Sequence, residues 1–166
     1  RPWLVAAALG VICGVTFFNS LHSDFMMDDY GLILQDTRGH NPRHLLKEFL
    51  PENRLIMSQT SEQVYYRPWA HIIPLGCYAL FRDNPFGYHV VNLILFWLAA
   101  LCVFGFIRCA FQDTALAFLT SLFFIIHPIN GLTVNYITAS VFSIQVIAMM
   151  LGLIAGCTDA DVTFVP

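Results

Sequence analysis

The fold class is decided by residues 86–107, which read FGYHVVNLILFWLAALCVFGFI and include no Asp, Glu, Lys or Arg. A helix rises about 1.5 Å per residue, so this stretch forms a helix about 33 Å long. That length crosses the hydrocarbon core of a bilayer, which is about 30 Å thick. The polar side chains of His89 and Asn92 interrupt it, and we expect them to face protein or a cavity because lipid offers no hydrogen-bond partner. The stretch is predicted to be a transmembrane helix.

Three further apolar stretches accompany it, at 2–18, 112–127 and 137–157. The first also has the length of a signal peptide, but no small-residue cleavage site follows, so we interpret it as a span. The sequence therefore predicts an all-α integral membrane protein with about four transmembrane helices, forming a single module over residues 1–166.

The composition agrees with this fold class. Hydrophobic residues make up 57% of the 166-residue chain and charged residues only 11%, with a mean hydropathy of +0.65. Soluble domains are about 25% charged, so a soluble fold could not bury this much apolar surface. The net charge is -3 without a basic tract, and no nucleic-acid partner is expected. None of the five cysteines forms a Cys-x-x-Cys pair, and their odd number argues against a complete disulfide framework.

The long polar region is the loop at 19–85, with six of the eight Lys and Arg and eight of the eleven Asp and Glu residues. Residues 41–50 predict a short amphipathic helix lying on the membrane surface. Residues 70–81 predict a second helix, too short to cross, that is surface-lying or re-entrant. The positive-inside rule places Arg1 and Arg108 in the cytoplasm, so the loop is expected to be extracytoplasmic, in a bacterial periplasm or an ER-type lumen.

Asp28 and Asp29 are the strongest candidates for chemistry, because they follow the first apolar stretch where a helix would leave the membrane. One carboxylate can act as a general base, and its neighbour can bind Mg²⁺ or Mn²⁺. Mutual repulsion raises one of the two pKa values. The alternative is that either aspartate caps a following helix.

The further candidates for substrate binding are Arg67, Tyr66 and His127. Arg67 follows Tyr66 and precedes a proline, which restricts its backbone and makes it a candidate phosphate clamp; the alternative is an arginine that extends from an interfacial helix to water. His127 precedes Pro128 at the end of an apolar stretch, and its alternative role is to hydrogen-bond backbone freed by the proline. A metal site at His40 and His44 is not favoured, because Pro42 lies between them.

The order of these motifs resembles the N-terminal part of the GT-C membrane glycosyltransferases. It is most similar to the protein O-mannosyltransferase-like branch that includes the transmembrane-and-tetratricopeptide proteins. The matching motifs are the acidic pair, Tyr-Arg-Pro at 66–68, Asn-Pro-x-x-Tyr-His-x-x-Asn at 84–92 and His-Pro at 127–128. The resemblance implies transfer of a sugar, with inversion, from a polyprenyl-phosphate donor at the outer membrane face. It also implies that Asp28 or Asp29 is the base or cation ligand and that Arg67 lies near the donor phosphate.

Two departures leave the function open. The stretch at 130–140 carries none of the charged residues that follow His-Pro in that branch, and four spans cannot enclose a lipid-linked sugar. One hypothesis is therefore an N-terminal piece of a longer glycosyltransferase. The other is a non-catalytic accessory subunit that binds lipids and neighbouring subunits of a larger membrane complex. A channel or transporter fragment would need polar stripes in the spans, and these are nearly absent.

Overall fold

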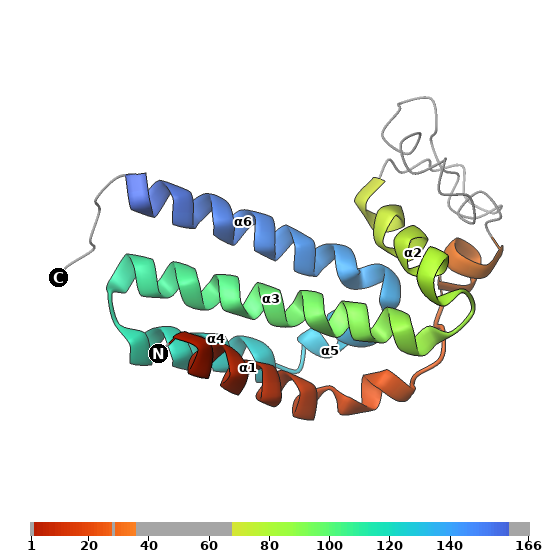
Figure 1. The fold of residues 1–166 in the computed structure, drawn as a ribbon, viewed down its shortest axis with the longest axis horizontal. Helices are drawn as coiled ribbons and strands as arrows, with labels where there is room; N and C mark the ends of the chain where they lie inside the picture. The colour runs from red at the N-terminus through yellow and green to blue at the C-terminus, as the bar shows by residue number, and fades with distance from the viewer. Residues whose placement is uncertain (1, 28, 36–67, 160–166) are drawn as a thin grey trace.

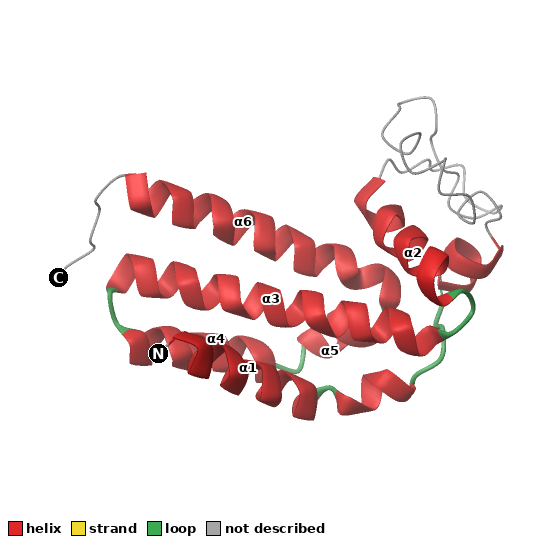
Figure 2. Cartoon of the chain, in the orientation of Figure 1, coloured by secondary structure: helices red, strands yellow, loops and turns green. Residues whose placement is uncertain are grey.

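The computed structural model describes residues 2–27, 29–35 and 68–159, and within them every regular element is a helix (Figure 2). The prediction of an all-α chain is therefore confirmed. The elements are α1 (Pro2–Thr16), η1 (Phe18–His22), η2 (Tyr30–Gln35), α2 (Pro68–Phe81), α3 (Pro85–Phe111), α4 (Thr114–Ile126), α5 (Asn130–Asn135), η5 (Ile137–Ala139) and α6 (Ser140–Asp159).

Helix α3 is the centre of the molecule and contacts α1, α2, α4, α5 and α6. Helices α1, α3, α4 and α6 run along the long axis, whereas α2 lies at one end together with η2 (Figure 1). The first helix packs closely on α3 at Gly10, where an added Cβ would lie 3.2 Å from the indole Nε1 of Trp97. That indole donates a hydrogen bond to the carbonyl of Ala6, 3.1 Å away.

The prediction of four spans is wrong for the described residues, since only two helical stretches there are long and apolar enough to cross a membrane: Pro85–Phe111 and Ile137–Thr158. Helix α1 has 15 residues and α4 has 13. At about 1.5 Å per residue they are about 22 and 20 Å long, less than the thickness of the hydrocarbon core.

Local chemistry explains why both helices end early. After α1, the hydroxyl of Ser20 donates to the carbonyl of Phe17 at 2.7 Å, and such a side-chain bond competes with the helical ladder. After α4, His127 adopts an extended backbone with ψ of 126°, as expected for a residue that precedes proline. The chain becomes helical again after each break, in η1 and α5, but as a separate short helix in each case.

Several predicted boundaries also change. Helix α3 continues to Phe111, beyond the predicted end at 107, because Gln112 closes it in the left-handed region with φ of 55°. The stretch 129–136, expected to be a simple connection, contains α5. The predicted helix at 70–81 is present as α2 and includes Pro74. The amphipathic helix predicted at 41–50 lies outside the described residues.

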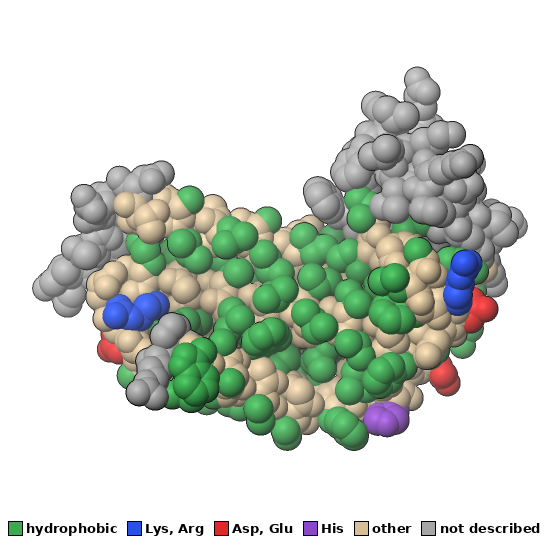
Figure 3. All heavy atoms as spheres, in the orientation of Figure 1, with side chains coloured by type: hydrophobic (Ala, Val, Ile, Leu, Met, Phe, Trp, Pro, Cys, Tyr) green, Lys and Arg blue, Asp and Glu red, His purple; other side chains and the backbone are tan. Residues whose placement is uncertain are grey.

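Charged side chains gather at the two ends of the long axis, with an apolar band between them (Figure 3). Arg82 and Asp83 follow α2 at one end, and Arg108 and Asp113 mark the other end of α3. Many large apolar side chains of the band are exposed: Val11, Val15, Ile94, Leu98, Leu116, Leu119, Phe123, Phe142, Met149, Leu151 and Leu153. An apolar band of this extent is typical of a surface that contacts lipid.

The close turn between α2 and α3 gives a test of the packing. A Cβ on the buried Gly87 would lie 2.2 Å from Cγ of Phe81, so Gly87→Ala must displace that ring. We expect it to lower the free energy of unfolding by about 1–3 kcal/mol, measured by thermal unfolding in detergent. Gly14→Ala is the matched control, because nothing lies within 4 Å of its added Cβ. Equal destabilisation by the two substitutions would contradict the packing described for this turn.

Candidate functional site

The carboxylate of Asp29 is held inside the protein where the chain leaves the apolar band. Its exposed fraction is 0%. Oδ2 accepts a hydrogen bond from the main-chain N–H of Met26 and Oδ1 accepts one from that of Thr138, both at 3.1 Å. The N–H of Asp29 in turn donates to the carbonyl of Met26 at 2.9 Å. We call the described part of this segment, residues 23–27, 29 and 30, the acidic corner.

The turn that carries the carboxylate is strained. Met27 has φ of 48°, in the left-handed region, although it is not a glycine. Such a conformation costs about 1–3 kcal/mol and persists only where the surroundings enforce it. Here the reciprocal hydrogen bonds between Met26 and Asp29 enforce it, and the side chain of Met27 itself is 79% exposed.

An apolar cluster surrounds the acidic corner. It is formed by buried side chains from five different elements or loops: Phe25, Ile33, Cys77, Tyr88 and Ile137. The rings of Phe25 and Tyr88 meet edge to face, with centroids 5.3 Å apart. This cluster excludes water from one side of the carboxylate and lowers the local dielectric constant.

Burial raises the pKa of the Asp29 carboxyl above its usual value of 3.8. Hydrogen bonds from Met26, Thr138 and Ile137 act in the opposite direction because they favour the ionised form, but they offset only part of the burial effect. No ion pair with Asp29 is found among the described residues. Among the described residues, its charge is therefore balanced by the main-chain N–H groups of Met26 and Thr138.

Helix α3 supplies two fully buried polar side chains to the same region, His89 and Asn92. The amide Nδ2 of Asn92 donates to three carbonyls at the end of α5, those of Thr133, Val134 and Tyr136, at 3.1, 2.9 and 3.2 Å. A helix end leaves such carbonyls without intrahelical partners, and Asn92 satisfies them from another helix. It thereby fixes the chain just before η5, where Thr138 contacts Asp29.

The structure brings together only some of the predicted site residues. Asp29 forms the buried corner, and neither of its hydrogen-bond donors lies in η2, so its side chain does not cap the following helix. Asp28, Tyr66 and Arg67 lie outside the described residues. The prediction for His127 as a substrate ligand stays untested: the side chain is exposed, and its Nδ1 accepts from the N–H of Ile129 at 3.3 Å.

His89 and Asn92 were not predicted as site residues. They were noted only as polar groups that need a protein environment. The signal that could have found them is their spacing, since residues three apart lie on one face of a helix and both interrupt an apolar stretch.

The described residues do not by themselves form a divalent-cation site. They contain no group of three His, Cys, Asp or Glu side chains that could hold a metal ion. Both oxygens of Asp29 already accept main-chain N–H groups, whereas Mg²⁺ prefers about six oxygen ligands, several of them water.

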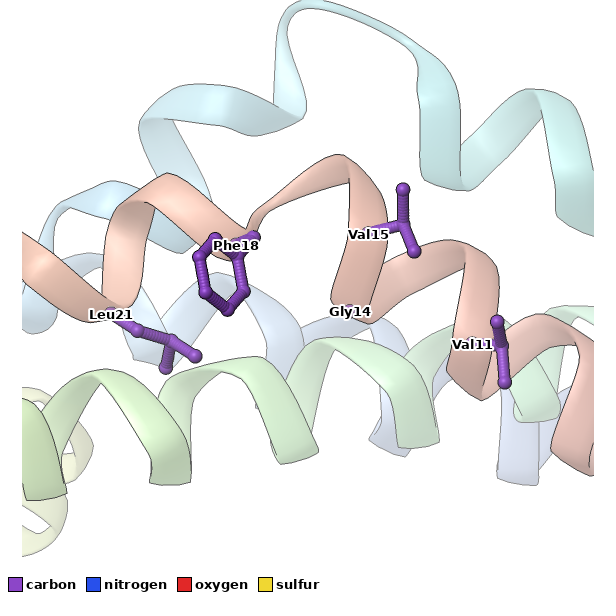
Figure 4. Close-up of a pocket in the computed structure, with 5 residues that line it drawn as sticks. All are labelled: Val11, Gly14, Val15, Phe18 and Leu21. Carbon is purple, nitrogen blue, oxygen red and sulfur yellow. The ribbon is translucent and has the colours of Figure 1, made fainter.

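A shallow apolar groove follows the outer side of α1 and η1 (Figure 4). It is lined by Val11, Gly14, Val15, Phe18 and Leu21, with no charged side chain among them. The groove belongs to the apolar band and carries no group that could take part in chemistry.

Comparison with known proteins supplies the family context. The chain is 28% identical to the protein O-mannosyl-transferase F38B6.6 of Caenorhabditis elegans over 98% of its own length and 24% of that protein. It is similar to protein O-mannosyl-transferases. It is 29% identical to the protein O-mannosyl-transferase Tmtc3 of Drosophila melanogaster, over 78% of this chain and 16% of that protein. It is 30% identical to the human protein O-mannosyl-transferase TMTC1, over 90% of this chain and 17% of that protein.

This similarity confirms the resemblance inferred from the order of motifs. The chain spans between about a sixth and a quarter of the length of these curated relatives. No family model matches the chain, and no solved structure does so either.

The role of Asn92 can be tested by removing its amide. Asn92→Leu leaves the three carbonyls at the end of α5 without their donor, and we expect a loss of about 1–3 kcal/mol in the free energy of unfolding. Ser143→Ala is the matched control, because that buried hydroxyl has no hydrogen-bond partner in the described part of the chain. Thermal unfolding of both variants in detergent measures the difference. A similar loss in both variants would contradict the assigned role.

The buried carboxyl of Asp29 predicts a specific pH dependence. Its pKa is raised in the folded state, so its contribution to stability is greatest below 3.8 and is lost as the pH rises through the folded pKa. Asp29→Asn removes this titration. We therefore expect wild type to lose stability relative to the variant as the pH increases from about 3 to about 7. Melting temperatures measured without divalent cations test this, and parallel curves would contradict it.

Proposed function

We propose that the chain is the part of a membrane glycosyltransferase that carries its catalytic acids. The observation that supports this best is the similarity, over 78–98% of the chain, to three proteins named protein O-mannosyl-transferases. The proposed reaction moves mannose from a polyprenyl-phosphate donor to a hydroxyl group of an acceptor. The accessory-subunit alternative is not favoured, since the relatives carry an enzyme name.

The proposed location is an integral membrane position in an ER-type or bacterial inner membrane. Two helices long enough to cross and charges confined to the two ends support it. The acidic corner lies at one end of the apolar band, where a lipid-linked phosphate would meet water. We place this end, with the loop at 19–85, on the non-cytoplasmic side.

The proposed chemistry assigns different tasks to the two aspartates. Both oxygens of Asp29 accept main-chain hydrogen bonds, which makes it suited to holding the corner in shape. Asp28 is then the general base. It takes the proton from the acceptor hydroxyl as that oxygen attacks the anomeric carbon, and the bond from this carbon to the phosphate oxygen breaks, so polyprenyl phosphate leaves. Attack opposite the leaving group inverts the configuration.

The remaining assignments concern the donor. Arg67, beside Tyr66, is proposed to bind the phosphate, because a guanidinium group donates two parallel hydrogen bonds to phosphate oxygens. His127 is exposed at the break between α4 and α5 and is proposed to contact the substrate. The apolar band, including the groove on α1, is proposed to contact the hydrocarbon chains of surrounding lipid.

Transfer assays on the full-length protein that carries this chain test the proposal. The donor is radiolabelled polyprenyl-phosphate mannose, and the acceptors are membranes from cells that lack the gene. We expect Asp28→Asn to lower transfer by at least about a hundredfold, as removal of a general base does. Arg67→Lys should lower transfer because lysine keeps the charge but loses the paired hydrogen bonds. Ser143→Ala serves as the control and is expected to transfer at the wild-type rate. Transfer by Asp28→Asn at the wild-type rate would contradict the proposal.

A further inference from the structure

The stretch 84–92 opens α3, and three of its four polar side chains have a structural task. Asn84 caps the helix by accepting from the N–H of Phe86 at 3.1 Å. The hydroxyl of Tyr88 donates to the carbonyl of Arg82 at 2.7 Å. Asn92 binds the end of α5.

The fourth polar side chain, His89, has no such task in the fold. Its exposed fraction is 0%, and neither ring nitrogen makes a hydrogen bond of good geometry with any of the described residues. A buried polar group without a partner costs about 1–3 kcal/mol, whereas an apolar side chain of the same size would carry no such cost. This cost indicates that the ring forms a hydrogen bond with a nearby group when the site is functional.

The described polar groups that interact with the ring belong to the acidic corner. The main chain of Ser23 and of Asp24 lies close enough to act as a hydrogen-bond partner, and the carboxylates of Asp24 and Asp29 act on the ring electrostatically. A neutral imidazole offers one N–H donor and one acceptor. Carbonyl and carboxylate oxygens need the donor, so the ring and the corner are complementary.

We propose that His89 is a positioning residue, whose ring N–H donates to an oxygen of the acidic corner and so fixes this corner for transfer. This rests on the proposed function for its catalytic consequence. The proposed hydrogen bond between His89 and the acidic corner does not depend on that function. Asp29 is anchored on one side by Thr138 of η5, and His89 anchors the preceding segment from α3.

Two further buried hydroxyls lie on α6, those of Ser140 and Ser143. Neither has a hydrogen-bond partner among the described residues, and the same holds for Oδ1 of Asn92.

The test compares three substitutions in the full-length protein. His89→Phe keeps the bulk of the ring and removes both nitrogens, whereas His89→Gln and His89→Asn place an amide N–H near Nε2 or Nδ1. Hydrogen exchange of the peptide covering residues 23–30 is measured by mass spectrometry, with the peptide covering 96–107 as an internal control. His127→Phe is the matched control for the exchange measurement alone, because that histidine is exposed.

If His89 positions the corner, exchange at 23–30 becomes at least about tenfold faster in His89→Phe and stays near wild type in one of the amide variants. Transfer of mannose should fall by at least about tenfold in His89→Phe and recover in the same amide variant. The proposal is overturned if exchange at 23–30 in His89→Phe is as slow as in wild type. It is also overturned if exchange is faster in all three variants, because the shape of the ring and not its N–H group would then hold the corner. If wild type shows no transfer at all, the proposed function fails while the exchange result still decides the role of His89.

Discussion

The buried carboxylate of Asp29 is the constraint on which the candidate site depends. A charged group with no exposure needs replacements for the water it loses, and here these are two main-chain N–H groups, one from Met26 and one from Thr138. The second of them is 109 residues away in the sequence. The bond therefore joins the exit of the first apolar stretch to the entry of the last one. It fixes the end of the apolar band and the place of the acidic corner.

Helix α3 organises the elements around that bond. Its first turns carry Asn92, which satisfies the end of α5, and its full length of 27 residues supports α6 on one side and α4 on another. The break at Pro128 makes this arrangement necessary. Because proline ends α4, the short helix α5 has carbonyls without intrahelical partners, and a side chain from α3 must supply their donor.

The distribution of polarity connects the fold to the proposed chemistry. Exposed apolar side chains between two charged ends suit a surface in lipid, and the described part of the acidic corner lies toward one of those ends. A reaction between a lipid-linked phosphate and a water-soluble acceptor requires such a place, since each reactant reaches it from its own phase. The carboxylate in its apolar cluster is then pre-organised, with little solvent to reorganise during transfer.

Hydrophobic patterning in the sequence determined the helical class and the two long helices, because helix formation and lipid solubility are local properties of residues 86–107 and 137–157. It overestimated the number of spans, since the stretches at 2–18 and 112–127 were counted by apolar length alone, whereas α1 has 15 residues and α4 has 13. Only the tertiary structure decided that Asp29 is buried and that His89 and Asn92 surround its anchor. Those contacts join residues 40 or more positions apart, and no local pattern encodes which distant N–H group a carboxylate will find.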